Sequence, residues 1–317
     1  SSAASDVYKR QVFHVSARTV AQNMWSIFGD QSDVMTCRST GFAMLASACP
    51  QEAMDLGAVA HLAAIKARHP FMHFFDGFRT SHELQKIDAL DYEDLRPLMD
   101  MDQINAFRKH SLNPEHPHVR GTTASSETFF QGREAGNGHY DAIPDIVQHY
   151  MDEINKLTGR NYKLFDYYGA DDAEEVVVVM GSGAETARET VDYLMSQGRK
   201  VGMISVHLFR PFSAKHFLSV LPETVKKVAV LDRTKESGAV GEPLYLDVKA
   251  VLTGSGRSFD TIVGGRFGLA AKDTTPSQII AVYDNLEQAQ PKNGFTIGIV
   301  DDVTFASLPC KDVLLPK

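Results

Sequence analysis

Four consecutive valines, Val176 to Val179, constrain the fold of this chain more than any other feature. A strand with apolar side chains on both faces must be covered from both sides, as the central strands of parallel sheets are. The valines are followed by Gly181-Ser182-Gly183 and then by a helical pattern over residues 184–197. The sequence therefore predicts a buried strand, a tight turn and a helix, which is the first half of a βαβ unit.

The same alternation continues to the end of the chain. Further strands are expected over residues 200–208, 225–231, 261–263 and 295–300, and helices over residues 213–221, 242–253 and 275–286. Successive βα units in one sheet are joined by right-handed crossovers, which make the strands parallel. We therefore expect this part to form a three-layer α/β domain.

A second set of strands is expected earlier in the chain. Phe71–Phe75 is largely apolar, follows Pro70 and stops at Asp76-Gly77, where a polar loop containing Arg79 begins. Open α/β sheets bind their ligands at the carboxyl ends of such strands. The apolar residues 12–15 form a second short strand, and a helix rich in small residues is expected over residues 50–68.

Arg18 follows the strand at residues 12–15 and is the candidate site residue of this chain. A guanidinium group offers a planar, two-pronged donor set that matches a carboxylate, so an arginine at a strand end can hold an acidic substrate. The alternative is a solvated ion pair without function, because most arginines form only such pairs. If Arg18 belongs to a site, it should open on the same sheet edge as Asp76.

Several local elements are expected with weaker patterns. Residues 19–27 are expected to form one or two helical turns, residues 81–87 a short helix, residues 94–110 a longer helix, residues 129–134 a loop, and residues 143–158 a helix ending at Gly159. His61 is interpreted as a packing or capping residue, because no second histidine stands at helical spacing from it.

Three polar features leave two interpretations open. Gly181-Ser182-Gly183 is a partial glycine fingerprint, which favours a tight strand-to-helix turn over a nucleotide site. Arg210 and the cluster Asp232–Glu236 each follow an expected strand, and each could serve a ligand or a contact between domains.

Composition excludes some classes of function. The net charge of −8 and the pI near 5.8 argue against nucleic acid or an anionic membrane as the main partner. No apolar run approaches the roughly 18 residues of a membrane span. The chain has three cysteines, Cys37, Cys49 and Cys310, and their spacing is not that of a metal-binding motif. Because an iron–sulfur cluster is usually held by four cysteines, this chain alone cannot ligate one. Unpaired thiols fit a reducing compartment. Residues 1–11 are expected to be a foreign or disordered leader.

Many blocks of this sequence, in one order from Val12 to Leu308, resemble pyruvate:ferredoxin (flavodoxin) oxidoreductases. The blocks are VFHVSAR (12–18), SIFGDQSD (26–33), TGFAMLAS (40–47), QEAMD (51–55), PFMHFFDGFRTSHE (70–83), LDYED (90–94), NPEHPHVRG (113–121), LFRPF (208–212), LDRTKE (231–236), GEPLYLDV (241–248) and VGGRFGL (263–269).

The resemblance implies two parallel-sheet, three-layer α/β domains, of which the first would be incomplete. Residues 12–164 would be the C-terminal part of a thiamine-diphosphate-type, pyruvate-binding domain, and residues 165–317 a domain like the C-terminal domain of transketolase. The block VFHVSAR implies that Arg18 binds the carboxylate of pyruvate. The family's thiamine-activating glutamate would lie upstream of Val12, and its diphosphate, Mg²⁺ and cluster ligands downstream of Lys317.

The implied reaction is oxidative decarboxylation of pyruvate to acetyl-coenzyme A with electrons passed to ferredoxin or flavodoxin. The full enzyme would use thiamine diphosphate, Mg²⁺, [4Fe–4S] clusters and coenzyme A, form a homodimer, and work in the cytoplasm or in a hydrogenosome or mitochondrion. This chain alone is expected to be inactive. The alternatives are the same region of a pyruvate:NADP⁺ oxidoreductase with a fused flavin module, a non-catalytic scaffold, and a nucleotide-binding module.

Overall fold

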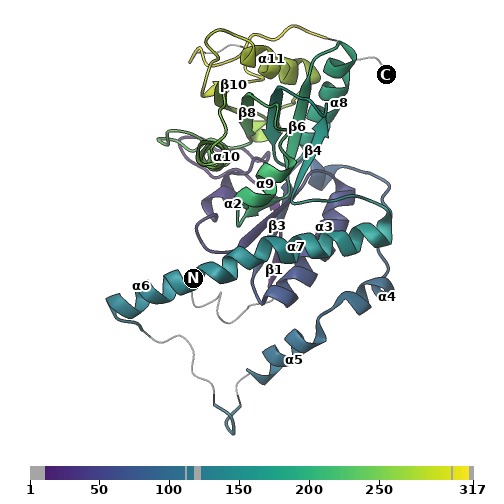
Figure 1. The fold of residues 1–317 in the computed structure, drawn as a ribbon, viewed down its shortest axis with the longest axis vertical. Coiled ribbons are helices and arrows are strands. Elements are labelled where there is room, and N and C mark those ends of the chain that lie inside the picture. Colours follow the sequence, from purple (N-terminus) through teal and green to yellow (C-terminus); the bar gives the residue numbers. More distant parts are fainter. Residues whose placement is uncertain (1–10, 111–112, 118–122, 301–302, 314–317) are drawn as a thin grey trace.

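The computed structural model describes residues 11–110, 113–117, 123–300 and 303–313. The expected leader, apart from Gln11, lies outside these ranges. Figure 1 shows two α/β units stacked along the longest axis, with the end of the chain in the upper unit and the long helix α7 (Asn137–Thr158) crossing the lower one. The fold class predicted from the sequence, two α/β units with mainly parallel sheets, is confirmed.

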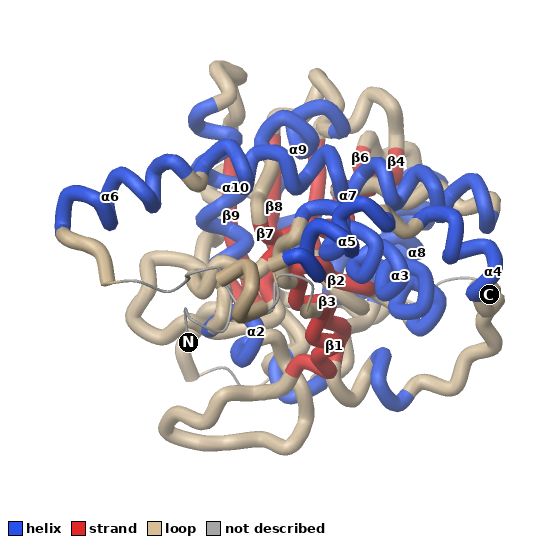
Figure 2. Tube along the Cα trace, turned by 90° about the horizontal axis from the view of Figure 1, so that it is seen from below, coloured by secondary structure: helices blue, strands red, loops and turns tan. Residues whose placement is uncertain are grey.

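The sheet of the first unit has the strand order β1-β3-β2-β7. Its strands are β1 (Val12–Ala17), β2 (Ala43–Ser47), β3 (Phe71–Asp76) and β7 (Leu208–Arg210). The first three are parallel to one another, and β7 runs antiparallel to β2. The helix α3 (Pro50–Ala67) packs on these strands and α7 packs on α3, so helices cover one face of the sheet (Figure 2).

The sheet of the second unit has the order β10-β9-β8-β5-β6-β4. Its strands are β4 (Phe165–Gly169), β5 (Glu175–Val179), β6 (Val201–Val206), β8 (Lys227–Asp232), β9 (Thr261–Arg266) and β10 (Phe295–Thr296). All pairs are parallel except β4 with β6. Its helices are α8 (Gly183–Ser196), α9 (Ala214–Val220), α10 (Pro243–Gly254) and α11 (Pro276–Leu286).

The four valines of β5 separate two hydrophobic cores. Val176 and Val178 belong to the core that also contains Leu244 of α10, whereas Val177 and Val179 belong to the core formed with residues of α8 and α11, and all four are fully buried. Adjacent side chains of a strand point to opposite faces, so a run without polar residues requires a layer of helices on each side. The three-layer prediction follows directly from this pattern and is confirmed.

Several local expectations were wrong. Residues 19–27 form a loop, which the Thr19 hydroxyl closes by donating to the carbonyl of Ser26. The helix expected over residues 81–87 is only the short 3₁₀ turn η1 (Thr80–His82). Residues 129–134 lie within the helix α6 (Ser126–Ala135), which begins because the Ser125 side chain accepts a hydrogen bond from the backbone N–H of Thr128. The last strand, expected over residues 295–300, contains only the two residues of β10.

The helix expected over residues 94–110 is divided into three pieces. These are α4 (Tyr92–Leu95), the 3₁₀ turn η2 (Arg96–Leu98) and α5 (Met101–Lys109). Pro97 has no N–H to continue a helix, and Asp100 starts a new one by accepting from the N–H of Gln103.

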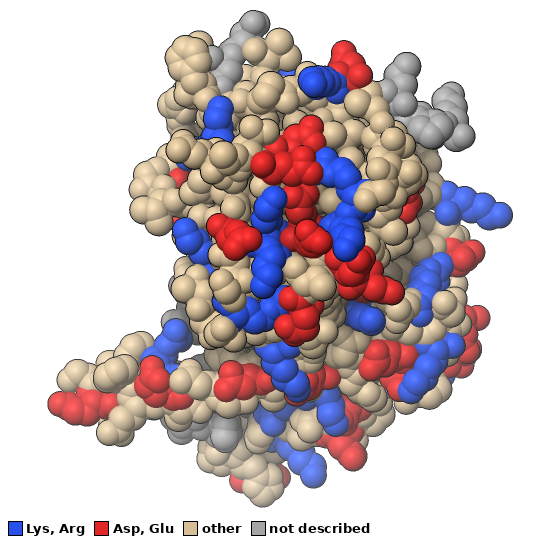
Figure 3. Space-filling model, turned by 45° about the horizontal axis from the view of Figure 1, so that its top comes forward, with Lys and Arg blue, Asp and Glu red and all other residues tan. Residues whose placement is uncertain are grey.

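The two units share a structural element. β7 lies in the second half of the sequence, beyond the proposed boundary between residues 164 and 165, yet it extends the sheet of the first unit. The division at residue 164 stays a proposal. No helix among the described residues has the length and apolarity that crossing a membrane requires. Acidic and basic side chains alternate over the face in Figure 3, so neither sign dominates there.

Candidate functional site

The carboxyl edges of the two sheets face each other. Asp76, which ends β3, contacts Ser182 after β5 and Arg233 after β8. In the second sheet, β5 connects to β6 on one side while β8 lies on the other. The crevice at such a reversal is where open α/β sheets bind ligands. Residues of the first unit therefore occupy the usual ligand position of the second.

Arg18 lies at this edge, as predicted. β1 and β3 are parallel neighbours with Ala17 opposite Asp76, so the loops after the two strands open on the same side of one sheet. The expectation that Arg18 and Asp76 share an edge is confirmed.

The guanidinium group of Arg18 is held but not neutralised. One Nη1–H donates to the carbonyl of Ile27 at 3.2 Å, and the group lies 4.8 Å from the centre of the Phe78 ring. The backbone N–H of Arg18 donates to Asp33 Oδ2 at 2.9 Å. Within the described part of the chain, no carboxylate forms an ion pair with this guanidinium. The partly exposed group therefore retains donors that a ligand carboxylate could use.

Two glycines make the loops beside Arg18 fit together. A Cβ atom at Gly77 would lie 2.2 Å from the carbonyl oxygen of Ala17 and 2.9 Å from Nε of Arg18. A Cβ atom at Gly29 would lie 2.6 Å from the carbonyl oxygen of Gly77. Only glycine allows the backbone to approach this closely. The position of the Arg18 side chain is thus defined by backbone that cannot accept a larger residue.

Asp76 joins the two units. Its buried carboxylate forms an ion pair with Arg233 at 2.7 Å, accepts from the N–H and hydroxyl of Ser182 at 2.8 and 2.6 Å, and accepts from Gln31 Nε2 at 2.9 Å. Arg79, from the following loop, also crosses to the second unit, where it donates to the carbonyl of Ala271.

These contacts bear on the alternatives left open by the sequence. Ser182 lies at the start of α8, where a helix N-terminus attracts anions, but the Asp76 carboxylate already occupies that position. This favours the strand-to-helix turn over a nucleotide site. Two ion pairs connect the units, one between Arg233 and Asp76 and the other between Arg38 and Glu236. Arg210 forms an ion pair with Asp247 at 2.6 Å. The charge clusters therefore make contacts within the protein.

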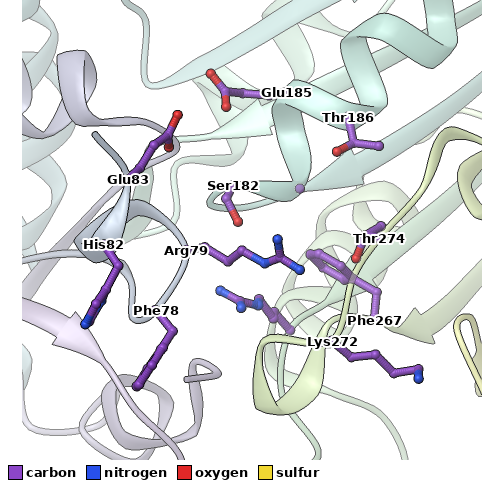
Figure 4. A pocket seen from close by; sticks show the side chains of 12 residues that line it. Phe78, Arg79, His82, Glu83, Ser182, Glu185, Thr186, Phe267, Lys272 and Thr274 are labelled. Carbon is purple, nitrogen blue, oxygen red and sulfur yellow. The ribbon is translucent and has the colours of Figure 1, made fainter. Parts of the chain in front are cut away.

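A cavity of about 420 Å³ lies between the units (Figure 4). Phe78, His82 and Glu83 reach it from the first unit, while Ser182, Glu185 and Thr186 lie opposite, and Arg79 extends across it. Phe267, Lys272 and Thr274 form its third wall. Its charged groups have both signs, so the cavity has no clear preference for anions or cations.

A second cavity of about 660 Å³ contains a buried histidine that no sequence pattern singled out. His207 lies 3.4 Å from carboxylate oxygens of Glu52 and Asp166, and its Nδ1 lies 2.7 Å from the carbonyl of Lys163. Burial alone would lower the pKa of His207, but the two carboxylates outweigh it and raise the pKa to about 9. His207 is thus a buried imidazolium near neutral pH.

Three histidine side chains from β1, β3 and α3, here called the histidine chain, contact one another in series through their ring nitrogens. His14 and His73 are paired across β1 and β3 with Nδ1 atoms 2.8 Å apart, and His14 Nε2 lies 3.0 Å from His61 Nε2. His73 Nε2 also lies 2.8 Å from the Ser47 hydroxyl. Burial, followed by the neighbouring imidazoles, lowers the pKa of His73 to about 3. The partner of His61 is His14, which lies in the strand β1, so the spacing of residues along the helix of His61 could not reveal it.

No group of three or more His, Cys, Asp or Glu side chains within the described ranges is arranged to hold a metal ion. In the histidine chain, the two ring nitrogens of His14 point to different partners, so the three rings do not converge on one point.

Two family models match this chain. Residues 11–152 match the thiamine-diphosphate-binding domain of pyruvate flavodoxin/ferredoxin oxidoreductases, and residues 173–279 match core domain II of pyruvate:ferredoxin oxidoreductase. Among solved structures, a 2-oxoglutarate:ferredoxin oxidoreductase from Magnetococcus marinus aligns with 87% of this chain and 48% of its own. Its TM-score is 0.54 and its identity 16%, so it supports the fold alone.

Curated relatives are much closer in sequence. A pyruvate:ferredoxin oxidoreductase of Moorella thermoacetica is 59% identical, and a pyruvate-flavodoxin oxidoreductase of Enterobacter agglomerans 56% identical, each over 95% of this chain. A pyruvate dehydrogenase [NADP(+)] of Cryptosporidium parvum is 51% identical over 94% of it. The chain covers 26%, 26% and 16% of these relatives. This chain therefore belongs to the pyruvate:ferredoxin/flavodoxin oxidoreductase family and spans about a quarter of the length of the first relatives it matches.

Proposed function

We propose that this chain forms the pyruvate-binding wall of a 2-oxoacid oxidoreductase that decarboxylates pyruvate oxidatively to acetyl-coenzyme A. The observation that carries the proposal is Arg18, a guanidinium without a carboxylate partner in the described structure, at the carboxyl edge of the first sheet. Arg18 would hold the carboxylate of pyruvate and orient the keto carbon. Binding one end of a small substrate in this way removes much of the entropic cost of reaching a reactive geometry.

The site is suited to share a substrate with thiamine diphosphate, the cofactor that the family model names. When bound, thiamine diphosphate supplies the carbon nucleophile and electron sink for decarboxylation of a 2-oxo acid. The glycine-lined loops at Gly29 and Gly77 have space for backbone only, which keeps this edge narrow beside Arg18. Mg²⁺, the [4Fe–4S] clusters and coenzyme A belong to the proposal for the full-length enzyme, as does its homodimer.

The electron acceptor is proposed to be ferredoxin or flavodoxin. Two of the relatives described above carry these acceptors in their names, whereas the Cryptosporidium parvum relative carries NADP⁺. Because this chain is more than half identical to each, the choice between ferredoxin, flavodoxin and NADP⁺ belongs to other parts of the full-length protein. Cys37, Cys49 and Cys310 form no disulfide, which fits a reducing compartment such as the cytoplasm, a hydrogenosome or a mitochondrion.

Substitution of Arg18 in the full-length enzyme that contains this chain tests the proposal. A charged hydrogen bond contributes about 1.5–3 kcal/mol, so Arg18→Ala should raise the pyruvate KM by roughly 10- to 100-fold. The KM for coenzyme A should not change. Arg96→Ala, which removes an exposed arginine whose ion-pair partner among the described residues is Glu93, is the matched control and should leave both constants unchanged.

Unchanged pyruvate kinetics in Arg18→Ala would remove Arg18 from the site and contradict the proposal. We also expect the isolated 317-residue chain to show no conversion of pyruvate to acetyl-coenzyme A. Turnover by the isolated chain would show that the remaining parts of the enzyme are dispensable.

A further inference from the structure

We propose that Arg233, in the second unit, is a positioning residue for Arg18, and that the second unit thereby sets the affinity of the enzyme for its 2-oxoacid. The inference rests on the proposed function of Arg18. Arg233 borders the 420 Å³ cavity between the units but is itself buried. Its side chain is 2% exposed, and it lies in the junction between the two units.

Arg233 makes four contacts with groups of both units. Its guanidinium forms the ion pair with Asp76, and its Nε donates to the carbonyl of Gly268 at 3.1 Å. Its Nη2 donates to the carbonyl of Gly29 at 3.5 Å. Its backbone carbonyl accepts from the N–H of Gln31 at 2.9 Å. One residue of the second unit thus holds both loops that flank Arg18.

On one side, the contacts lead to the backbone of Arg18 through Gln31. The side chain of Gln31 donates to Asp76, and its backbone binds Arg233, so its position is fixed at the start of α2 (Ser32–Thr36). Asp33, in the first turn of α2, accepts from the N–H of Arg18 and donates its own N–H to the Arg18 carbonyl at 3.2 Å. A shift of Gln31 is therefore transmitted to both backbone groups of Arg18.

On the other side, the contacts lead to Arg18 through Gly77. Asp76 is fixed by Arg233 and Ser182, and the next residue, Gly77, donates its N–H to the carbonyl of Ala17 at 3.2 Å. The Arg18 side chain passes directly over Gly77, as the close approach of Nε to a Cβ at that position shows. Arg18 is thus enclosed between two loops that meet at the Asp76–Arg233 pair.

A lysine cannot replace this arginine. A guanidinium offers five N–H donors in a rigid plane, whereas an ammonium is a compact charge on a flexible stem. A lysine side chain at this position could neutralise Asp76 but could not at the same time bind the carbonyls of Gly268 and Gly29, which lie in different units. Arg233→Lys therefore keeps the buried charge and releases the loop at Gly29.

The matched control is Arg199, at the opposite edge of the second sheet. It also joins several elements, through Glu175, Asp284 and Glu287, but it has no contact with the loops around Arg18. If Arg233 only held the fold together, Arg233→Lys and Arg199→Lys would change thermal stability without changing the KM for pyruvate.

The experiment measures pyruvate and coenzyme A kinetics of the full-length enzyme that contains this chain. Displacement of a binding group by about 1 Å can cost up to 100-fold, so we expect Arg233→Lys to raise the pyruvate KM at least about 10-fold. The coenzyme A KM and kcat should change little, and Arg199→Lys should change neither KM. In an Arg18→Ala background, Arg233→Lys should have no further effect on the pyruvate KM, because it acts through Arg18.

An unchanged pyruvate KM in Arg233→Lys, or an effect that adds fully to that of Arg18→Ala, would overturn the inference. Both results are distinct from failure of the proposed function, in which Arg18→Ala itself leaves the pyruvate KM unchanged. If Arg233→Lys does not fold, Gln31→Met provides the second test. It removes the amide donor to Asp76 without changing charge, and it should raise the pyruvate KM in the same selective way.

Discussion

Replacing Gly77 by alanine is the most direct test of how closely the loops around Arg18 are packed. The added Cβ would lie 2.2 Å from the carbonyl oxygen of Ala17, whereas ordinary contacts begin at 3.4 Å, so the groups must separate by 3.4 − 2.2 = 1.2 Å. The Ala17 oxygen is backbone within the parallel sheet and cannot rotate away. The Arg18 side chain, with Nε at 2.9 Å and Cδ at 3.0 Å, must move as well.

Two magnitudes follow from this displacement. Overpacking of this kind costs about 1–3 kcal/mol of unfolding free energy. Movement of a substrate-binding group by about 1 Å can lower catalytic efficiency by up to 100-fold. We therefore expect Gly77→Ala to lower the urea midpoint of the chain and, in the full-length enzyme, to raise the pyruvate KM by roughly 10-fold or more.

Gly132→Ala is the control for this substitution. Gly132 lies in α6, and no atom lies within 4 Å of its added Cβ. Alanine is the better helix former by about 1 kcal/mol, so the control should be as stable as the original protein or more stable. An unchanged urea midpoint together with an unchanged pyruvate KM in Gly77→Ala would refute the conclusion that these loops have no spare room.

Three further predictions concern the stability of the chain in urea unfolding. The pKa of His207, raised to about 9 in the fold from about 6.5, contributes up to about 3 kcal/mol that is fully present below pH 6.5 and lost as the pH rises to about 9. His207→Gln should flatten the pH dependence in that window, and an identical loss in the variant would contradict this. Because burial lowers the pKa of His73 to about 3, the free energy of unfolding should fall by about 1.4 kcal/mol per pH unit as the pH drops from about 6.5 to about 3. His73→Asn should remove this pH dependence, and an unchanged slope in the variant would contradict the assignment. Thr275→Ala removes the capping box of α11, in which the Thr275 hydroxyl accepts a hydrogen bond from the N–H of Gln278. This substitution should lower the free energy of unfolding by about 1 kcal/mol, and an unchanged value would show that the cap is dispensable.

The junction places a carboxylate of the first unit at the anion-binding position of the second unit's crevice. The helix N-terminus at Ser182 and the cation Arg233 are features that could bind a phosphate, but the Asp76 carboxylate lies against both of them. A buried carboxylate whose partners are all in place is stable, whereas removal of one partner leaves an uncompensated charge. The same groups that would recognise an external anion therefore connect the units.

Regular elements with strong patterns were predictable from the sequence. The valines of β5 and the apolar β3 were found where expected, because burial on two faces leaves a clear apolar pattern. The helix α7 ends at Gly159 as expected, but it begins at Asn137 rather than at residue 143. The loop at residues 19–27 and the helix α6 were not predicted, because their residues are mostly exposed and no burial pattern distinguishes the two states. Their conformations depend on single hydrogen bonds from Thr19 and to Ser125.

The sequence by itself determined the α/β class, the parallel strands and the placement of Arg18 at a strand end. Each of these follows from neighbours along the chain, where periodicity acts. Only the tertiary structure decided that Arg233 meets Asp76, that His207 lies between Glu52 and Asp166, and that β7 completes the first sheet. These residues are far apart in sequence, and their pairing is set by how two sheets pack edge to edge, which no local pattern records.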